Sequence, residues 1–202
     1  IATGASPRML NVTGEKKYFA NGVSTCATCD AYFYKNKIVA VIGGGDSAME
    51  ETLTLSKFAK KIYLIHRRDA FKASKIMQDR VMKLKDKVEI IWNTGVQEVL
   101  GDGKFVTELK LNNLITNKSS ELTVDGMFLA IGHIPNTQIF HGTITLDEEG
   151  YIITDKRCKT NVQGVFAAGD CQDRIYRQAV TSAGTGCQAA LEAERYIESL
   201  KD

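Results

Sequence analysis

Two cysteines separated by two residues, with an acid directly after the second, stand at Cys26-Ala27-Thr28-Cys29-Asp30. Cysteines at this spacing can close a small, reducible disulfide, and the acid could supply or accept the proton that thiol chemistry needs. The cysteines at positions 158, 171 and 187 add no second close pair. Structural zinc is the competing interpretation, but it normally needs four ligands, often as two such pairs. The odd cysteine count favours a reducing compartment with one special pair.

A glycine-rich turn follows at Gly43-Gly44-Gly45-Asp46-Ser47-Ala48. It has the form G-x-G-x-x-A and lies between a short apolar run and a helical pattern, which is the context that a dinucleotide-binding βαβ unit requires. There the first glycine permits a tight turn, the second lets the backbone approach a pyrophosphate, and the small residue at 48 lets the helix pack on the strand. The helix N-terminus then faces the phosphates. A turn that merely joins strand to helix is the alternative.

A basic cluster, His66-Arg67-Arg68, follows the next apolar run, where an NAD-binding fold usually presents an acid to the ribose. Two guanidinium groups can bind a 2′-phosphate that an acid would repel, so we expect NADPH rather than NADH. A solvated surface cluster is the alternative. Because nicotinamide delivers a hydride, its electrons generally reach a disulfide through a flavin. Asp170 could bind a ribitol or ribose hydroxyl, or else cap a helix.

The elements that must position these residues alternate between strands and helices. Apolar runs predict buried strands at 38–42, 62–65, 88–92 and 127–131. Helical periodicity predicts helices at about 47–59 and 74–84. Shorter alternating runs between 95 and 125 predict an antiparallel meander inserted into the parallel fold. A further strand is expected at 165–168 and a long helix at about 178–200. The cysteine pair lies before the βαβ unit rather than at the start of the helix that follows the first strand of that unit.

The first residues of the chain carry two signals. Residues 1–7 and 129–135 share the pattern apolar-Ala-x-Gly-x-x-Pro, and each is expected to be a strand that ends at a glycine turn, although chance similarity is the alternative. Residues 1–4 resemble the end of a buried strand, so we expect a longer polypeptide of which this chain is a part. No signal peptide is visible, which makes the cytoplasm the default location.

Composition narrows the classes of function. The 202 residues, with 44% apolar and 25% charged side chains and a formal charge of +2, fit one large domain or two small ones. This balance argues against strong attraction to nucleic acid or to a membrane surface. No stretch approaches the ~20 apolar residues of a membrane span.

Several motifs stand in order along the chain: Cys26 to Asp30, Gly43 to Ala48, His66-Arg67-Arg68, Ala130-Ile131-Gly132-His133 with Pro135-Asn136, Gly169-Asp170, Tyr176-Arg177-Gln178-Ala179 and Ser182-Ala183-Gly184-Thr185-Gly186. Together they resemble the low-molecular-weight, bacterial-type thioredoxin reductases. The resemblance covers essentially the whole chain and implies a flavoenzyme homodimer that moves electrons from NADPH through FAD to the cysteine pair and then to thioredoxin. It implies a Rossmann-like NADPH-binding domain at 9–133, inserted into an FAD-binding α/β domain represented by 1–8 and 134–202.

The resemblance also implies roles for individual residues. Cys29 would lie next to the flavin, Cys26 would attack the thioredoxin disulfide, and Asp30 would be the acid-base group. The 2′-phosphate would lie on Arg67, Arg68 and Lys72, the last replacing the family's more usual arginine. Further residues expected to contact NADPH are Gly43, Gly44, Gly45, Asp46, Ser47, Ala48, His66, Ile131 and Gly132; those expected to contact FAD are Thr3, Gly4, Ala5, Gly169, Asp170, Arg177, Gln178 and Ala179.

The family's FAD domain begins with its own glycine-rich fingerprint, which is not in this sequence. We therefore expect the 202 residues alone to bind NADPH, to bind FAD weakly or not at all, and not to turn over. A related flavin disulfide reductase serving a peroxiredoxin is the nearest enzymatic alternative. A relative that does not use NADPH is a third, which Arg67 and Arg68 disfavour. Domain rotation is expected about hinges near residues 8–10 and 133–136.

Overall fold

The computed structural model describes residues 1–201. The chain divides into two compact units. One is continuous and comprises residues 8–132; the other joins residues 1–7 to residues 133–202. Within residues 1–201, no helix combines the length and apolarity needed to cross a bilayer.

The continuous unit is built on a five-stranded sheet in the order β2-β9-β3-β4-β5, and every pair in it is parallel. The chain runs from β3 outward to β4 and β5 and later returns to place β9 on the other side of β3. Ligands of such sheets bind where the strand order reverses, at the carboxyl ends of the strands. This confirms the expected Rossmann-like parallel fold. The strands are β2 (Val23–Ser24), β3 (Ile38–Gly43), β4 (Lys61–Ile65), β5 (Val88–Ile91) and β9 (Gly126–Ala130).

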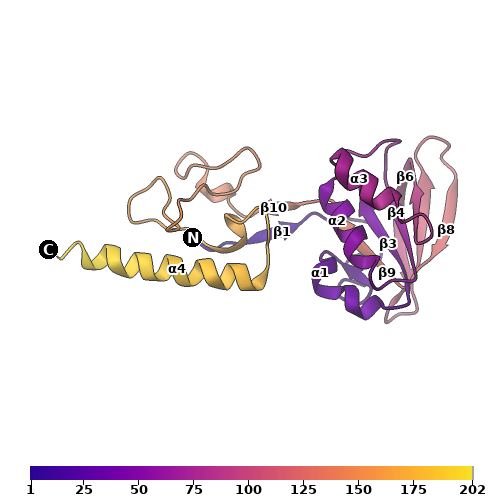
Figure 1. Ribbon diagram of the computed structural model, residues 1–202, viewed down its shortest axis with the longest axis horizontal. Helices are drawn as coiled ribbons and strands as arrows, with labels where there is room; N and C mark the ends of the chain where they lie inside the picture. Colours follow the sequence, from indigo (N-terminus) through magenta and orange to yellow (C-terminus); the bar gives the residue numbers. More distant parts are fainter. Residues whose placement is uncertain (202) are drawn as a thin grey trace. The chain divides into compact units, whose positions relative to one another are not determined.

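Successive residues of β3 point to opposite faces of this sheet, and each face is covered. Val39 and Val41 join the apolar cluster on the helix side, whereas Ala40 and Ile42 join the cluster shared with a second sheet. That second sheet is the antiparallel meander predicted between 95 and 125, and Figure 1 shows it on the side of the parallel sheet away from the helices. The covering elements are α1 (Ala27–Asp30), η1 (Ala31–Tyr34), α2 (Asp46–Leu55) and α3 (Lys75–Met82) on one face and β6 (Thr94–Gly101), β7 (Val106–Asn113) and β8 (Ser119–Thr123) on the other.

The discontinuous unit contains the two copies of the sequence repeat. Each copy ends in a short strand, and these two strands pair antiparallel with Ala5 opposite Pro135. A small apolar cluster around Ile152, Ala167 and Cys171 forms the core of this unit. Its elements are β1 (Ala5–Pro7), β10 (His133–Pro135), η2 (Gln138–Phe140), η3 (Gly169–Cys171) and α4 (Ala179–Glu198).

Two strands predicted for this unit do not form, so these two predictions are wrong. Residues 1–4 and 165–168 form no regular strand. They lie beside each other, because the Ile1 ammonium donates to the Phe166 carbonyl (2.6 Å) and the Ala168 N–H donates to the Ile1 carbonyl (2.9 Å). A bridge between Phe166 and Lys159 is isolated, so neither segment has the run of consecutive ladder bonds that defines a strand.

Candidate functional site

Cys26 and Cys29 form a disulfide with their Cα atoms 5.3 Å apart. Cys26 is the N-cap of α1, its carbonyl accepts from the N–H of Cys29 (3.2 Å), and Asp30 N–H donates to the same carbonyl (3.1 Å). The pair precedes the βαβ unit formed by β3, α2 and β4, as expected, and it begins a short helix of its own. The two-residue strand β2 and the four-residue helix α1 are too short to show in the apolar pattern. The first helical turn brings residues three apart to one side, where the sulfurs meet.

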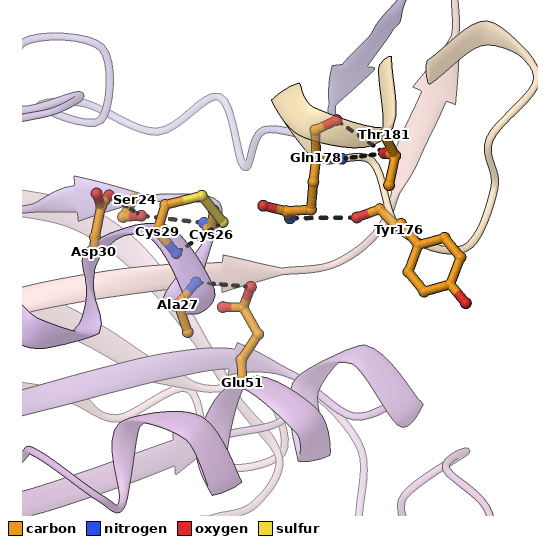
Figure 2. Close-up of a disulfide and its surroundings, with 9 residues drawn as sticks. All are labelled: Ser24, Cys26, Ala27, Cys29, Asp30, Glu51, Tyr176, Gln178 and Thr181. Atoms are coloured by element: carbon orange, nitrogen blue, oxygen red, sulfur yellow. Dashed lines mark hydrogen bonds between the residues drawn. A yellow bond between two sulfur atoms is a disulfide. The ribbon is translucent and has the colours of Figure 1, made fainter. Parts of the chain in front are cut away.

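Asp30 is held beside the disulfide by Ser24, a residue that the sequence did not single out. The Ser24 hydroxyl donates to Asp30 Oδ2 (2.7 Å), and its oxygen accepts from the Cys26 N–H (3.1 Å). Ser24 is buried at the end of β2. One hydroxyl thus fixes the carboxylate relative to the turn that carries both sulfurs (Figure 2).

The glycine turn has the shape that a dinucleotide site requires. Gly43 ends β3 beside Ala130, and an added Cβ there would lie 2.4 Å from the Ala130 carbonyl oxygen and 2.8 Å from the Ala48 Cβ. Gly45 is the N-cap of α2, and a Cβ there would meet nothing within 4 Å. Packing therefore demands glycine at 43 and small alanine at 48, whereas at Gly45 the open space fits the close approach of a pyrophosphate. The residues present fit a dinucleotide.

Four hydrogen bonds fasten the basic loop to this turn. The Gly44 carbonyl accepts from the N–H groups of Lys72 (2.8 Å) and Ala73 (3.0 Å). The Asp46 carboxylate accepts from both the N–H (2.9 Å) and the hydroxyl (2.8 Å) of Ser74, the N-cap of α3. The two bonds from Ser74 lower the pKa of Asp46. Gly44 and Asp46, the first residue of α2, thus fix the last three residues of the loop before α3.

His66 lies beneath the turn. A Cβ on Gly44 would come within 2.2 Å of its ring, and the ring also packs against Phe71 and Trp92. Its Nε2 donates to the Ala70 carbonyl (3.1 Å). Burial and the nearby Arg68 lower the pKa of His66, which favours the neutral ring. His66 therefore supports the turn and its loop by packing.

Arg67, Arg68 and Lys72 are exposed, and within residues 1–201 none of them forms an ion pair. The loop that carries them begins directly after β4, while Ile131 and Gly132 follow β9. Since the strands are parallel, these segments and the glycine turn meet at one edge of the sheet. The structure thus brings together all the residues expected to contact NADPH.

The residues expected to contact FAD all belong to the discontinuous unit. Asp170 accepts from the Ser182 hydroxyl of α4 (2.7 Å), and the Gly169 N–H donates to the Thr185 hydroxyl (3.0 Å). Gly4, with φ +71°, is tied to the chain after β10, because its carbonyl accepts from the Asn136 N–H (2.9 Å). Thr3 and Ala5 flank that glycine.

The entry to α4 is organised by Asp173, which the sequence did not single out. Its carboxylate accepts from the N–H groups of Ile175, Tyr176 and Arg177 and from the Thr181 hydroxyl. Burial alone would raise the pKa of Asp173, but these bonds together lower it. Arg177 has a positive φ of +48°, and Gln178 and Thr181 form a capping box at the start of α4, just before Ala179. An open cavity of about 600 Å³ in this unit is lined by residues that include Asp173 and Thr181 but none of the residues expected to contact FAD.

The comparisons with known proteins agree with this architecture. Residues 1–186 match the family described as pyridine nucleotide-disulphide oxidoreductase, and the chain belongs to that family. Similar curated proteins include thioredoxin reductases: one from Rickettsia conorii is 51% identical over 200 residues, and one from Schizosaccharomyces pombe is 51% identical over 205. The resemblance that the motifs indicated is thereby confirmed.

These relatives are longer than the chain. The alignments cover 98% and 100% of the chain but 64% and 63% of the two relatives. A solved thioredoxin reductase from Streptococcus pyogenes superposes with a TM-score of 0.93 at 41% identity, over 98% of this chain and 65% of that one. The chain thus spans just under two thirds of the length of the proteins that it matches.

Proposed function

We propose that the protein acts as an NADPH-dependent thioredoxin-disulfide reductase, which passes electrons from NADPH through FAD to the Cys26–Cys29 disulfide and on to thioredoxin. The observation that carries the proposal is the packing of the disulfide-bearing turn on α2, the helix whose N-terminus is the glycine turn: the Ala27 N–H donates to Glu51 of that helix (3.2 Å). The curated relatives named thioredoxin reductase support it. A cytoplasmic homodimer belongs to the same proposal.

Each group of residues has a part in binding the nucleotide. The backbone from Gly43 to Ala48 receives the pyrophosphate, and the exposed Arg67, Arg68 and Lys72 bind the 2′-phosphate. Ile131 and Gly132 complete the edge of the sheet. Thr3 to Ala5, Gly169-Asp170 and Arg177 to Ala179 would bind FAD. When bound, FAD supplies the chemistry by which the two electrons of a nicotinamide hydride become available to a disulfide.

The dithiol then reduces its partner by thiol-disulfide exchange. The Cys26 thiolate attacks one sulfur of the thioredoxin disulfide, a mixed disulfide forms, and the other thioredoxin sulfur leaves and takes a proton. The Cys29 thiolate attacks Cys26, which restores the Cys26–Cys29 bond and releases the second thioredoxin sulfur. Asp30, oriented by Ser24, transfers protons at these sulfurs.

The test is spectroscopic and kinetic. With FAD bound, NADPH should bleach the flavin absorbance, and the protein should reduce thioredoxin. C26S and C29S should abolish thioredoxin reduction while NADPH still bleaches the flavin; C187S, at an exposed cysteine of α4, should change neither. Unchanged thioredoxin turnover in C26S would refute the assigned dithiol.

A second candidate follows from the length of the chain relative to its relatives. The 202 residues alone would bind NADPH but hold FAD weakly and not turn over, because they span about 64% of the first relative. A colourless chain that binds NADPH would support this candidate, whereas tight FAD binding would contradict it. A reductase that serves a peroxiredoxin instead would be recognised by its preference for that partner over thioredoxin.

A further inference from the structure

Glu51 connects the cofactor helix to the disulfide. It lies in the middle of α2, and its Oε1 accepts from the N–H of Ala27, the residue that follows Cys26 at the start of α1 (3.2 Å). Figure 2 shows the Glu51 side chain reaching from α2 to the turn that carries both sulfurs. Its Oε2 is buried and, within residues 1–201, has no hydrogen-bond partner.

A buried carboxylate oxygen without a donor is costly when it is ionised. Burial raises the pKa of Glu51 to about 7, against a smaller opposing effect of the Ala27 bond, and the negative charges of Asp30 and Glu50 raise it further. Glu51 therefore changes its charge in the pH range in which thiols become thiolates.

No cationic side chain on the neighbouring elements neutralises the negative charge of an ionised Glu51. On α1 and at its N-cap the ionisable groups of the reduced protein are Asp30 and the two cysteines. On η1 they are Tyr34 and the exposed Tyr32, and burial and Asp30 raise the pKa of Tyr34. On the other elements that pack against α2, the charged side chains are engaged elsewhere: Lys75 of α3 pairs with Asp79, Arg80 of α3 contacts the sulfur of Met77, and Lys61 of β4 pairs with Glu89. A negative charge on a cysteine sulfur would thus add to an anionic group that already includes Asp30.

We propose that Glu51 is a positioning residue of the dithiol, which holds the first turn of α1 through Ala27 and takes up a proton when reduction leaves a negative charge on one of the two sulfurs. The inference rests on the proposed function, because it assumes that the Cys26–Cys29 disulfide is reduced in a working cycle.

The electrons and protons of this step balance. Reduction breaks the S–S bond with two electrons from the bound flavin or from a dithiol reagent; one sulfur takes a proton, and the other remains a thiolate. A second proton from solvent binds Glu51 Oε2, the oxygen that lacks a donor. The net charge is therefore the same before and after reduction, because the new thiolate charge replaces the charge that Glu51 loses. When the disulfide re-forms, both protons leave and are available to the partner's two thiols.

The first experiment uses the whole chain, reduced with dithiothreitol and freed of reagent under argon. Alkylation of the peptide that carries Cys26 and Cys29 by iodoacetamide is measured by mass spectrometry from pH 5 to pH 10. E51Q keeps an oxygen for the Ala27 N–H but cannot carry the charge that opposes the thiolate. Its alkylation midpoint should lie about one pH unit below that of the wild type. E121Q, at an exposed glutamate of β8, is the matched control and should leave the midpoint unchanged.

The second measurement does not depend on the folding of E51Q. An infrared difference spectrum, dithiothreitol-reduced minus oxidised at pH 7.5, should show the gain of a protonated-carboxyl C=O band in the wild type and in E121Q. The absence of that band, or an E51Q midpoint equal to that of the wild type, overturns the proposal. If Glu51 had a purely structural role, E51Q would lower the stability of the protein and leave the alkylation midpoint unchanged. Neither readout uses NADPH, FAD or thioredoxin, so a failure of the proposed function would appear separately, as missing turnover.

Discussion

Replacing Gly45 with alanine separates cofactor binding from folding, because the structure gives no intramolecular reason for a glycine there. Gly45 has φ −97° and ψ −176°, an extended conformation open to any residue, and its added methyl would meet no atom within 4 Å. The change should alter the free energy of unfolding by no more than about 0.5 kcal/mol. The same methyl occupies the space that the proposed site leaves for the pyrophosphate.

Gly43 provides the contrast within the same turn. With φ +156°, a Cβ there would lie 2.4 Å from the Ala130 carbonyl oxygen, a backbone atom of the adjacent strand, and 2.8 Å from the Ala48 Cβ. Neither neighbour is the end of a flexible side chain, so β3 and α2 would have to separate. G43A should therefore cost about 2–4 kcal/mol of stability.

Urea denaturation and NADPH titration, followed by fluorescence or calorimetry, measure the two effects on the same samples. G45A should unfold at the urea concentration of the wild type and bind NADPH at least tenfold more weakly, about 1.4 kcal/mol. G43A should show a lowered urea midpoint. The reasoning is refuted if G45A, folded as the wild type, binds NADPH with unchanged affinity, since the open space would then not be the place where phosphates approach.

Three further predictions concern the loop beside this turn and the carboxyl beneath the disulfide. The double variant R67A R68A should bind NADPH about 10- to 100-fold more weakly and NADH unchanged; equal losses for both nucleotides in calorimetric titrations would contradict a 2′-phosphate site. S74A, which removes the hydroxyl bond to Asp46 and keeps the backbone bond, should raise the Kd for NADPH about 3- to 10-fold without changing the urea midpoint greatly; an unchanged Kd would show that the loop needs no such anchor. The pKa of Glu51 is raised from 4.5 to about 7, so the native state binds this proton more tightly than the unfolded chain, and the free energy of unfolding should fall by up to about 3 kcal/mol as pH rises from 4.5 to 7. E51Q should lose that part of the fall in urea titrations across this range, and an identical pH profile would contradict the buried charge.

The sequence predicted the parts of the fold that local patterns determine. The apolar runs before and after Gly43 fix a strand and a helix, and the parallel sheet follows from repeating that unit. The run at 165–168 failed because strand formation depends on a partner elsewhere in the chain: it is apolar, but its neighbour Ile1 gives it no continuous ladder. Similarly, the turn at Cys26 is helical only for the four residues of α1, which is too short for a periodicity to appear.

The supporting residues of the site were harder to predict, because their roles arise from contacts distant in sequence. Ser24 became important only when β2 placed it under Asp30, and Ser74 only when the sheet brought α3 to the start of α2. Glu51 alone carried a local signal: three residues after Ala48 and four before Leu55, it shares the buried face of the helix. An acid on that face needs a donor or a proton.

His66 has a packing role that its place next to the two arginines in the sequence does not reveal. The prediction placed it with Arg67 and Arg68 as a cofactor contact, and the structure does place it at the same edge of the sheet. Its ring, however, fills the space against Gly44, and the lowered pKa favours the uncharged form near pH 7. Under the proposed function, the charge for a 2′-phosphate would come from the exposed arginines and Lys72. The His66 ring itself leaves no room for a Cβ at position 44, which accounts for the glycine there.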